Sequence, residues 1–190
     1  MNKLKIFFFT LIVLCNSAMA KEKKAYFAGG CFWCVEEAFE QTNGVKEVIS
    51  GYTGGHIKNP TYEQVSHTET GHYEAVEVIY DSEIVTYDQL LDIFWKNIDP
   101  YDAQGQFCDK GSSYLSAIFY QDENELKSIE ESKKRLKNVD TASFATHIKK
   151  LDIFYNAEDY HQDFYKKNPI RYKLYKNGCG RVPRLKKIWG

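Results

Sequence analysis

The feature that most constrains the fold is a cysteine placed where a predicted strand meets a predicted helix. The apolar run at residues 25–28 predicts a short strand, two glycines allow a tight turn, and a helical segment starts at Cys31. A thiol at a helix N-terminus lies near the positive end of the helix dipole, which lowers the thiol pKa. The pattern predicts a nucleophilic Cys31 beside an apolar wall formed by Phe32 and Trp33, a site suited to redox chemistry on a small, partly hydrophobic group.

The first twenty residues predict an export signal. A basic start precedes the apolar run at 6–14, and Ala18 and Ala20 form a small-x-small cleavage site. The run is too short for a stable membrane span, which is typical of a secretory signal peptide. We therefore expect removal of residues 1–20, an exported and periplasmic protein, and one domain over residues 21–190 with no membrane span.

The overall composition is that of an ordinary globular domain. The chain has 25 basic and 26 acidic residues, for a formal net charge of −1, so electrostatics gives no argument for a nucleic-acid partner. The 14 tyrosines and 12 phenylalanines are expected to fill a core and line a pocket. We expect a monomer.

The order of predicted elements favours an α+β fold. Apolar residues at helical spacing predict helices over 87–97 and 122–137, and period-two alternation predicts a strand over 73–80. Further strands are expected between the helices, over 45–52, 114–120 and near 148–154. Two strands followed by a helix, repeated, predict a two-layer ferredoxin-like plait of the split βαβ kind, with additional helices and an irregular, aromatic C-terminal tail.

Glu74 is the second candidate for chemistry. It shares one face of a predicted strand with Val76 and Val78. Burial of a carboxyl group raises its pKa and keeps it protonated near neutral pH, which suits a proton donor. The alternative is a frayed strand end that points Glu74 to water, and the period alone does not choose between them.

Polar residues in two loops complete the candidate site. Tyr62 follows an Asn-Pro-Thr turn, and Asp109 and Tyr114 lie in a Gly/Ser-rich loop that enters a strand. Each of the three alone fits a structural role. Together they would supply hydrogen-bonding groups that hold an oxygen atom.

Four cysteines remain after signal removal: Cys31, Cys34, Cys108 and Cys179. They allow three disulfide pairings, among which sequence does not choose, and two structural disulfides are one possibility in an exported protein. A metal site is not expected, because Cys108 and Cys179 are far apart in sequence and the five histidines show no metal-binding spacing. His161 is expected to cap or pack a helix.

Five blocks of residues resemble the peptide methionine sulfoxide reductase A family, in that family's order and spacing. They are GCFW at 30–33, GGH at 54–56 with NPTY at 59–62, GHYE at 71–74, DKGSSY at 109–114, and AEDYHQ at 157–162. The resemblance covers nearly all of the chain after residue 20.

The resemblance implies a role for each matched residue. Cys31 matches the catalytic cysteine, and Phe32 and Trp33 match the wall that holds the substrate methyl group. The groups that match those binding and protonating the sulfoxide oxygen are Tyr62, Glu74 and Tyr114, with Asp109 as their supporting acid.

The resemblance also implies a reaction. Cys31 attacks the sulfur of the S epimer of methionine sulfoxide, in proteins or as the free amino acid, and becomes a sulfenic acid. A second thiol then forms a disulfide with it, and an external thioredoxin-like dithiol reduces that disulfide. No bound metal, flavin or nicotinamide is implied.

The chain departs from the family pattern at two cysteines. Cys34 stands where the family usually has glycine, and Cys179 lies in a tail that differs from the better-known glycine-rich one. Both are candidates for the resolving thiol, with Cys179 slightly preferred because it resembles the family's C-terminal cysteine by region. Cys108 is expected to be a buried thiol near the pocket.

Two other classes of function fit parts of the sequence. A thioredoxin-like thiol–disulfide oxidoreductase would also place a Cys-x-x-Cys at the start of a helix, but it would need neither Glu74 nor Tyr62 and expects a proline loop opposite the cysteines. An exported binding module with an aromatic pocket and structural disulfides would not need a reactive Cys31.

Overall fold

The computed structural model describes residues 21–190, so the predicted signal peptide lies outside the described residues. The helices are α1 (Phe32–Glu40), α2 (Tyr62–His67), α3 (Tyr87–Lys96), α4 (Glu123–Arg135), α5 (Phe164–Lys167), α6 (Pro169–Gly178) and α7 (Arg181–Trp189). The strands are β1 (Glu22–Gly29), β2 (Val45–Thr53), β3 (Tyr73–Asp81), β4 (Gly105–Gln106), β5 (Asp109–Lys110), β6 (Ser116–Tyr120), β7 (His147–Lys150) and β8 (Phe154–Asn156).

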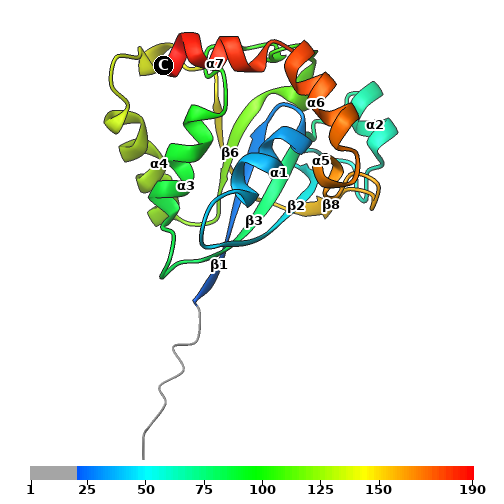
Figure 1. The fold of residues 1–190 in the computed structure, drawn as a ribbon. Helices are drawn as coiled ribbons and strands as arrows, with labels where there is room; N and C mark the ends of the chain where they lie inside the picture. Colours follow the sequence, from blue (N-terminus) through cyan, green and yellow to red (C-terminus); the bar gives the residue numbers. More distant parts are fainter. Residues whose placement is uncertain (1–20) are drawn as a thin grey trace, which may run out of the picture.

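The fold is a mixed α+β structure built on a six-stranded sheet. The strand order is β7-β6-β1-β3-β2-β8, and every neighbouring pair is antiparallel except β6 and β7. Helices α1 and α3 lie on one face of this sheet (Figure 1). β4 and β5 form a separate small hairpin.

Alternation along the central strands separates two apolar clusters. Phe27 of β1 and Val76 and Val78 of β3 belong to the main core, which also contains the buried faces of α1 and α3. Tyr26 and Tyr73 belong to a smaller cluster on the opposite face. Because side chains alternate between faces, Glu74 lies on the same face as Val76 and therefore on the side of the sheet that carries α1.

Two glycines make the junction between β1 and α1 possible. Gly30 has a φ of +80°, and a Cβ at this position would lie 2.5 Å from Cβ of Gln106. Any other residue would therefore be strained and would collide with the β4–β5 hairpin. Gln106 is itself buried, and its side-chain amide accepts a hydrogen bond from the Asp99 N–H and donates one to the Asp99 carbonyl oxygen. The junction places Cys31 at the N-cap of α1.

Several predicted boundaries are wrong. The predicted strand over 114–120 begins at Ser116, because Ser112–Tyr114 form a 3₁₀ turn. The strand predicted near 148–154 is two strands: β7, which pairs with β6, and β8, which pairs with β2 at the other edge of the sheet. An apolar run does not say which partner each end meets, so this split was not visible in the sequence.

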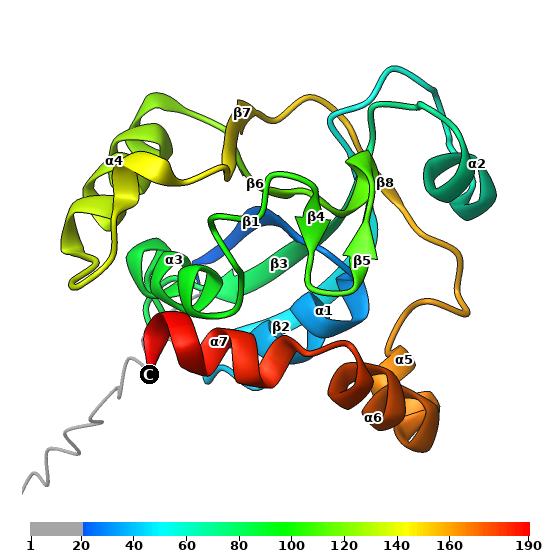
Figure 2. The ribbon, with the colours of Figure 1, turned by 90° about the horizontal axis from the view of Figure 1, so that it is seen from above.

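The C-terminal tail is helical rather than irregular. Helix α7 lies beside α3 (Figure 2). Buried Arg181, the first residue of α7, donates hydrogen bonds to the carbonyl oxygens of Gly29, at the end of β1, at 2.9 Å and of Asn97, after α3, at 2.6 Å. Within residues 21–190, the helices are all too short or too polar to span a bilayer.

Candidate active site

A small cavity of about 70 Å³ opens at the start of α1. It is lined by Cys31, Phe32, Trp33, Tyr62, Glu74, Asp109, Tyr114 and Tyr175. Seven of these eight were proposed from the sequence, and the fold brings them together from α1, α2, β3, β5, the 3₁₀ turn and α6. Tyr175 was missed, because its aromatic, helical tail offered no motif that pointed to the pocket.

Cys31 is buried, with 7% of its surface exposed. The backbone N–H of Phe32, the first in α1, donates a hydrogen bond to Oε2 of Glu74 at 3.1 Å and not to the Cys31 sulfur. Burial, followed by the neighbouring Cys34, raises the pKa of Cys31 well above its usual value. The expected lowering of its pKa by the helix N-terminus is therefore wrong for the resting site, where desolvation dominates.

Cys34 is the thiol with a lowered pKa. It is free and 4% exposed, and it contacts Cys31 directly. The hydrogen bond from Cys31 lowers the pKa of Cys34 to about 6, and the cations of Arg181 and Lys176 act in the same direction. The two pKa values are therefore shifted in opposite directions, and Cys34 is the more acidic thiol of the buried pair.

Glu74 is fully within the site. It is 2% exposed, so the alternative of a frayed strand end is wrong. Burial raises the pKa of Glu74 to about 8, against the opposing hydrogen bond from the Phe32 N–H. The carboxyl group is therefore mostly protonated at neutral pH and can give up a proton.

Two phenols face the carboxyl group. Tyr62 opens α2, where Thr61 forms a capping box with Gln64 and where Glu158 accepts from the Tyr62 N–H at 2.9 Å. Tyr114 lies on the 3₁₀ turn and lines the cavity together with Tyr62 and Glu74. Burial raises the pKa of both phenols, which keeps their protons available for hydrogen bonds.

The apolar wall is held rigid from behind. The ring of Trp33 stacks on Phe164 with centroids 3.7 Å apart, and its Nε1 donates to Nδ1 of His161 at 3.2 Å. His161 also packs against Phe32 and Tyr62, with ring centroids 4.9 and 4.4 Å apart. His161 has the packing role expected of it, and it fixes the orientation of three rings that line the cavity.

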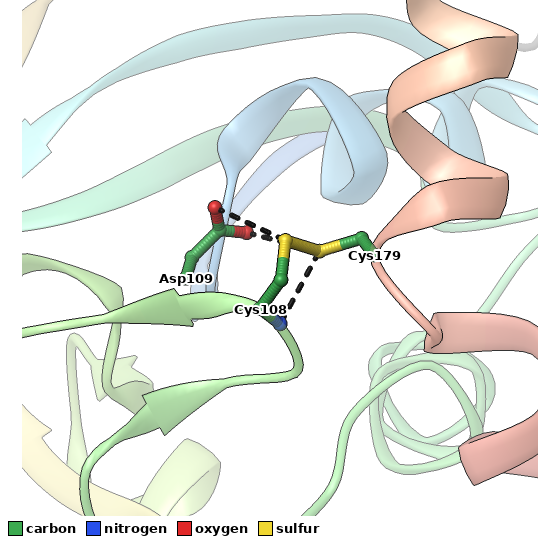
Figure 3. Close-up of side chains that lie close together, drawn as sticks. All are labelled: Cys108, Asp109 and Cys179. Carbon is green, nitrogen blue, oxygen red and sulfur yellow. Dashed lines mark hydrogen bonds between the residues drawn. A yellow bond between two sulfur atoms is a disulfide. The ribbon is translucent and has the colours of Figure 1, made fainter.

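The remaining cysteines form a disulfide beside Asp109, one of the residues that line the cavity (Figure 3). Cys108 is exposed and bonded to Cys179, so the expectation of a buried Cys108 thiol is wrong. Cys179 is not a free thiol either, which removes the basis for preferring it as the resolving cysteine. Asp109 lies beside both sulfurs at 3.7 Å, but sulfurs bonded to each other are not the thiolates that a metal site requires.

Comparisons with known proteins identify the family. A family model described as peptide methionine sulfoxide reductase matches residues 23–190. The Bacillus subtilis peptide methionine sulfoxide reductase MsrA is 48% identical over 172 residues, which cover 90% of this chain and 97% of that protein.

Solved structures also match. Reduced Mxr1 of Saccharomyces cerevisiae has a TM-score of 0.74 at 29% identity, covering 80% of this chain and 88% of that one. Methionine sulfoxide reductase A of Corynebacterium diphtheriae has a TM-score of 0.70 at 32% identity, covering 78% of this chain and 76% of that one.

A fold of this kind, with a thiol and a protonated carboxyl group in one small pocket, defines an oxidoreductase that works through cysteine chemistry. The chain belongs to the peptide methionine sulfoxide reductase family. Its activity is that of a peptide-methionine (S)-S-oxide reductase that passes through thiol and disulfide states. The thioredoxin-like alternative is not favoured.

Proposed function

We propose that Cys31 attacks the sulfoxide sulfur while the substrate methyl group rests against Phe32 and Trp33. The observation that carries this proposal is the meeting of the Cys31 thiol and the protonated Glu74 carboxyl group in one cavity of about 70 Å³. That volume suits the end of an unbranched side chain. Oxidised methionine in proteins and as the free amino acid is the proposed substrate, and repair of oxidised proteins is the proposed role.

The proposed proton path uses groups already in contact. As Cys31 attacks, its proton passes to the Cys34 thiolate, with which it shares a hydrogen bond. Glu74 gives its proton to the sulfoxide oxygen, and Tyr62 and Tyr114 donate hydrogen bonds to that oxygen as charge develops. Methionine leaves, and Cys31 carries the oxygen as a sulfenic acid.

Cys34 is the proposed resolving thiol because it touches Cys31 in the buried pair. Its sulfur attacks the sulfenic sulfur of Cys31, an S–S bond forms, and the hydroxyl group leaves with the Cys34 proton as water. Glu74 regains a proton from solvent. An external thioredoxin-like dithiol then reduces the Cys31–Cys34 disulfide by exchange, so no bound cofactor is needed in the proposed cycle.

The finer fold and location are also proposals. The central strand order β6-β1-β3-β2, with α1 and α3 on one face, supports classing the core as a ferredoxin-like plait. The signal-like pattern at residues 1–20 supports export to the periplasm. The Cys108–Cys179 disulfide is a second argument, because such bonds persist in oxidising compartments.

The test of the proposed reaction is turnover of separated epimers. The protein is given a methionine sulfoxide peptide as its S or its R epimer, with dithiothreitol as the reductant, beside Cys31→Ser. We expect reduction of the S epimer alone and its loss in the variant. Equal turnover in Cys31→Ser, or none with the S epimer, would overturn the proposal.

A further inference from the structure

Tyr175 enters the active-site cavity from α6, an element that contributes no other residue to it. Its ring stands edge-on to Trp33, with centroids 6.0 Å apart and planes at 82°. Its hydroxyl group donates to the Asp109 carboxylate, and the phenol lines the same cavity as Cys31, close enough to lower the pKa of the Cys31 thiol. The phenol therefore lies between an acid and the reacting sulfur.

A single hydroxyl proton cannot serve both neighbours at once. While Cys31 holds its own proton, the charged acceptor is Asp109, and the observed hydrogen bond goes there. Once Cys31 loses its proton, the thiolate becomes a second charged acceptor for the same hydroxyl group. A hydrogen bond to a charged acceptor is stronger than one between neutral groups. The hydroxyl group can thus turn to the sulfur when negative charge appears on it.

The covalent structure around Tyr175 holds both partners in place. Cys179 follows α6, and its bond to Cys108 ties the end of that helix to the residue before Asp109 (Figure 3). Two residues further on, Arg181 bonds the carbonyl oxygen of Gly29 at 2.9 Å, close to Cys31. The disulfide therefore limits the distance between the Tyr175 phenol and the Asp109 carboxylate. The Arg181 hydrogen bond limits the distance between the end of α6 and Cys31.

We propose that Tyr175 is a further catalytic residue, which donates a hydrogen bond to the Cys31 thiolate, and that the Cys108–Cys179 disulfide holds it in position. The proposal rests on the proposed attack by Cys31. The titratable groups around Cys31 come from every element of the site: Cys34 from α1, Tyr62 from α2, Glu74 from β3, Asp109 from β5, Tyr114 from the 3₁₀ turn and Tyr175 from α6.

The test compares Tyr175→Phe with Tyr165→Phe. Tyr165 also donates to a carboxylate, that of Glu40, but it does not line the cavity, so its variant controls for loss of a phenol from this part of the chain. All variants are made with Cys34→Ser, with Cys108 and Cys179 kept as a disulfide, so that Cys31 is the only free thiol in residues 21–190. Iodoacetamide alkylation is measured from pH 5 to 10, and methionine released from an S-epimer peptide is measured in a single turnover without reductant.

We expect Tyr175→Phe to shift the alkylation midpoint to higher pH and to slow the single turnover by on the order of tenfold or more, as for a lost hydrogen bond to a charged group. Tyr165→Phe should leave both unchanged. Thermal unfolding of each variant shows whether it is folded. Unchanged midpoint and rate in a folded Tyr175→Phe would overturn the proposal.

The role of the disulfide is tested by non-additivity. The double change Cys108→Ser and Cys179→Ser should move the midpoint and the rate in the same direction as Tyr175→Phe, but less. When the double change is made in a protein that already carries Tyr175→Phe, we expect no further change in midpoint or rate. If the disulfide acted independently of Tyr175, its effects would add in full to those of Tyr175→Phe. If the wild-type protein, with Cys34 present, releases no methionine, the proposed function fails, a result distinct from equal rates in the Cys34→Ser parent and its Tyr175→Phe variant.

Discussion

Cys31 and Cys34, the inner pair, lie within one helical turn and are both buried and free, whereas Cys108 and Cys179, the outer pair, are separated by 71 positions and joined in a disulfide beside Asp109. The first pair is made by local sequence: two glycines, a strand and a helix start. The second is made by the whole fold, which brings the β4–β5 hairpin to the end of α6. The comparison fits the two proposed roles, in which the first pair carries out the chemistry and the second holds the groups around it.

The largest expected effect is a difference in reductase activity between variants of the two cysteine pairs. Cys31→Ser should lower reductase activity by at least about 10⁴-fold, because it removes the nucleophile. The Cys108→Ser and Cys179→Ser double variant should stay within about tenfold of the parent, the scale of a misplaced hydrogen bond. Steady-state rates with dithiothreitol measure both. A double variant as inactive as Cys31→Ser would place the chemistry in the outer pair.

The next effect separates the pairs by stability. Removing a disulfide that closes a loop of 71 residues should lower the free energy of unfolding by about 4 kcal/mol on the chain-entropy account. Urea unfolding of the same double variant, with and without reductant, measures this. If the parent and the double variant unfolded at the same urea concentration without reductant, the outer pair would have no holding role.

The pH dependence of turnover tests the role of Glu74 beside Cys31 and Cys34. Glu74→Gln should lower turnover by about a hundredfold, the scale of general acid catalysis. The parent rate should fall as pH rises through about 8, since the Glu74 carboxyl group loses its proton there. The variant should lack this decline. An identical alkaline limb in both proteins would assign it to another group.

The same pKa shift has a consequence for stability. Folding raises the pKa of Glu74 from 4.5 to about 8, so the folded state favours the protonated form. Its contribution is present in full below about pH 4.5 and is lost as pH rises toward 8. Glu74→Gln, which mimics the protonated group, should therefore gain in thermal stability relative to the parent across this window. A constant difference would contradict the raised pKa.

The smallest expected effect concerns the phenols. Tyr62→Phe should slow turnover by about tenfold, the value of one hydrogen bond to developing charge, while Tyr165→Phe should change nothing because its hydroxyl group bonds Glu40 outside the cavity. Single-turnover rates with the S epimer compare the two. Equal slowing in both would show a general effect of losing a phenol.

The inner site could be predicted from sequence because its signals are local. The Gly-Gly-Cys junction predicts Cys31 from local pattern alone, whereas Glu74, Tyr62 and Tyr114 are only candidates by pattern and gain their roles from the family resemblance of the blocks that contain them. The pairing of Cys108 with Cys179 and the entry of Tyr175 depend on where α6 packs, which no local pattern encodes. The direction of the Cys31 pKa shift was also missed, because burial and the use of the first N–H of α1 by Glu74 outweigh the helix dipole.

The most direct test of the account is to find which disulfide a single turnover creates. Protein with free Cys31 and Cys34 and an intact Cys108–Cys179 bond is mixed with an S-epimer peptide without reductant, and methionine and disulfide-linked fragments are measured by mass spectrometry. The account predicts one methionine per protein, a new Cys31–Cys34 bond and an unchanged outer bond. A Cys31–Cys179 bond with Cys108 released, or no product at all, would contradict it.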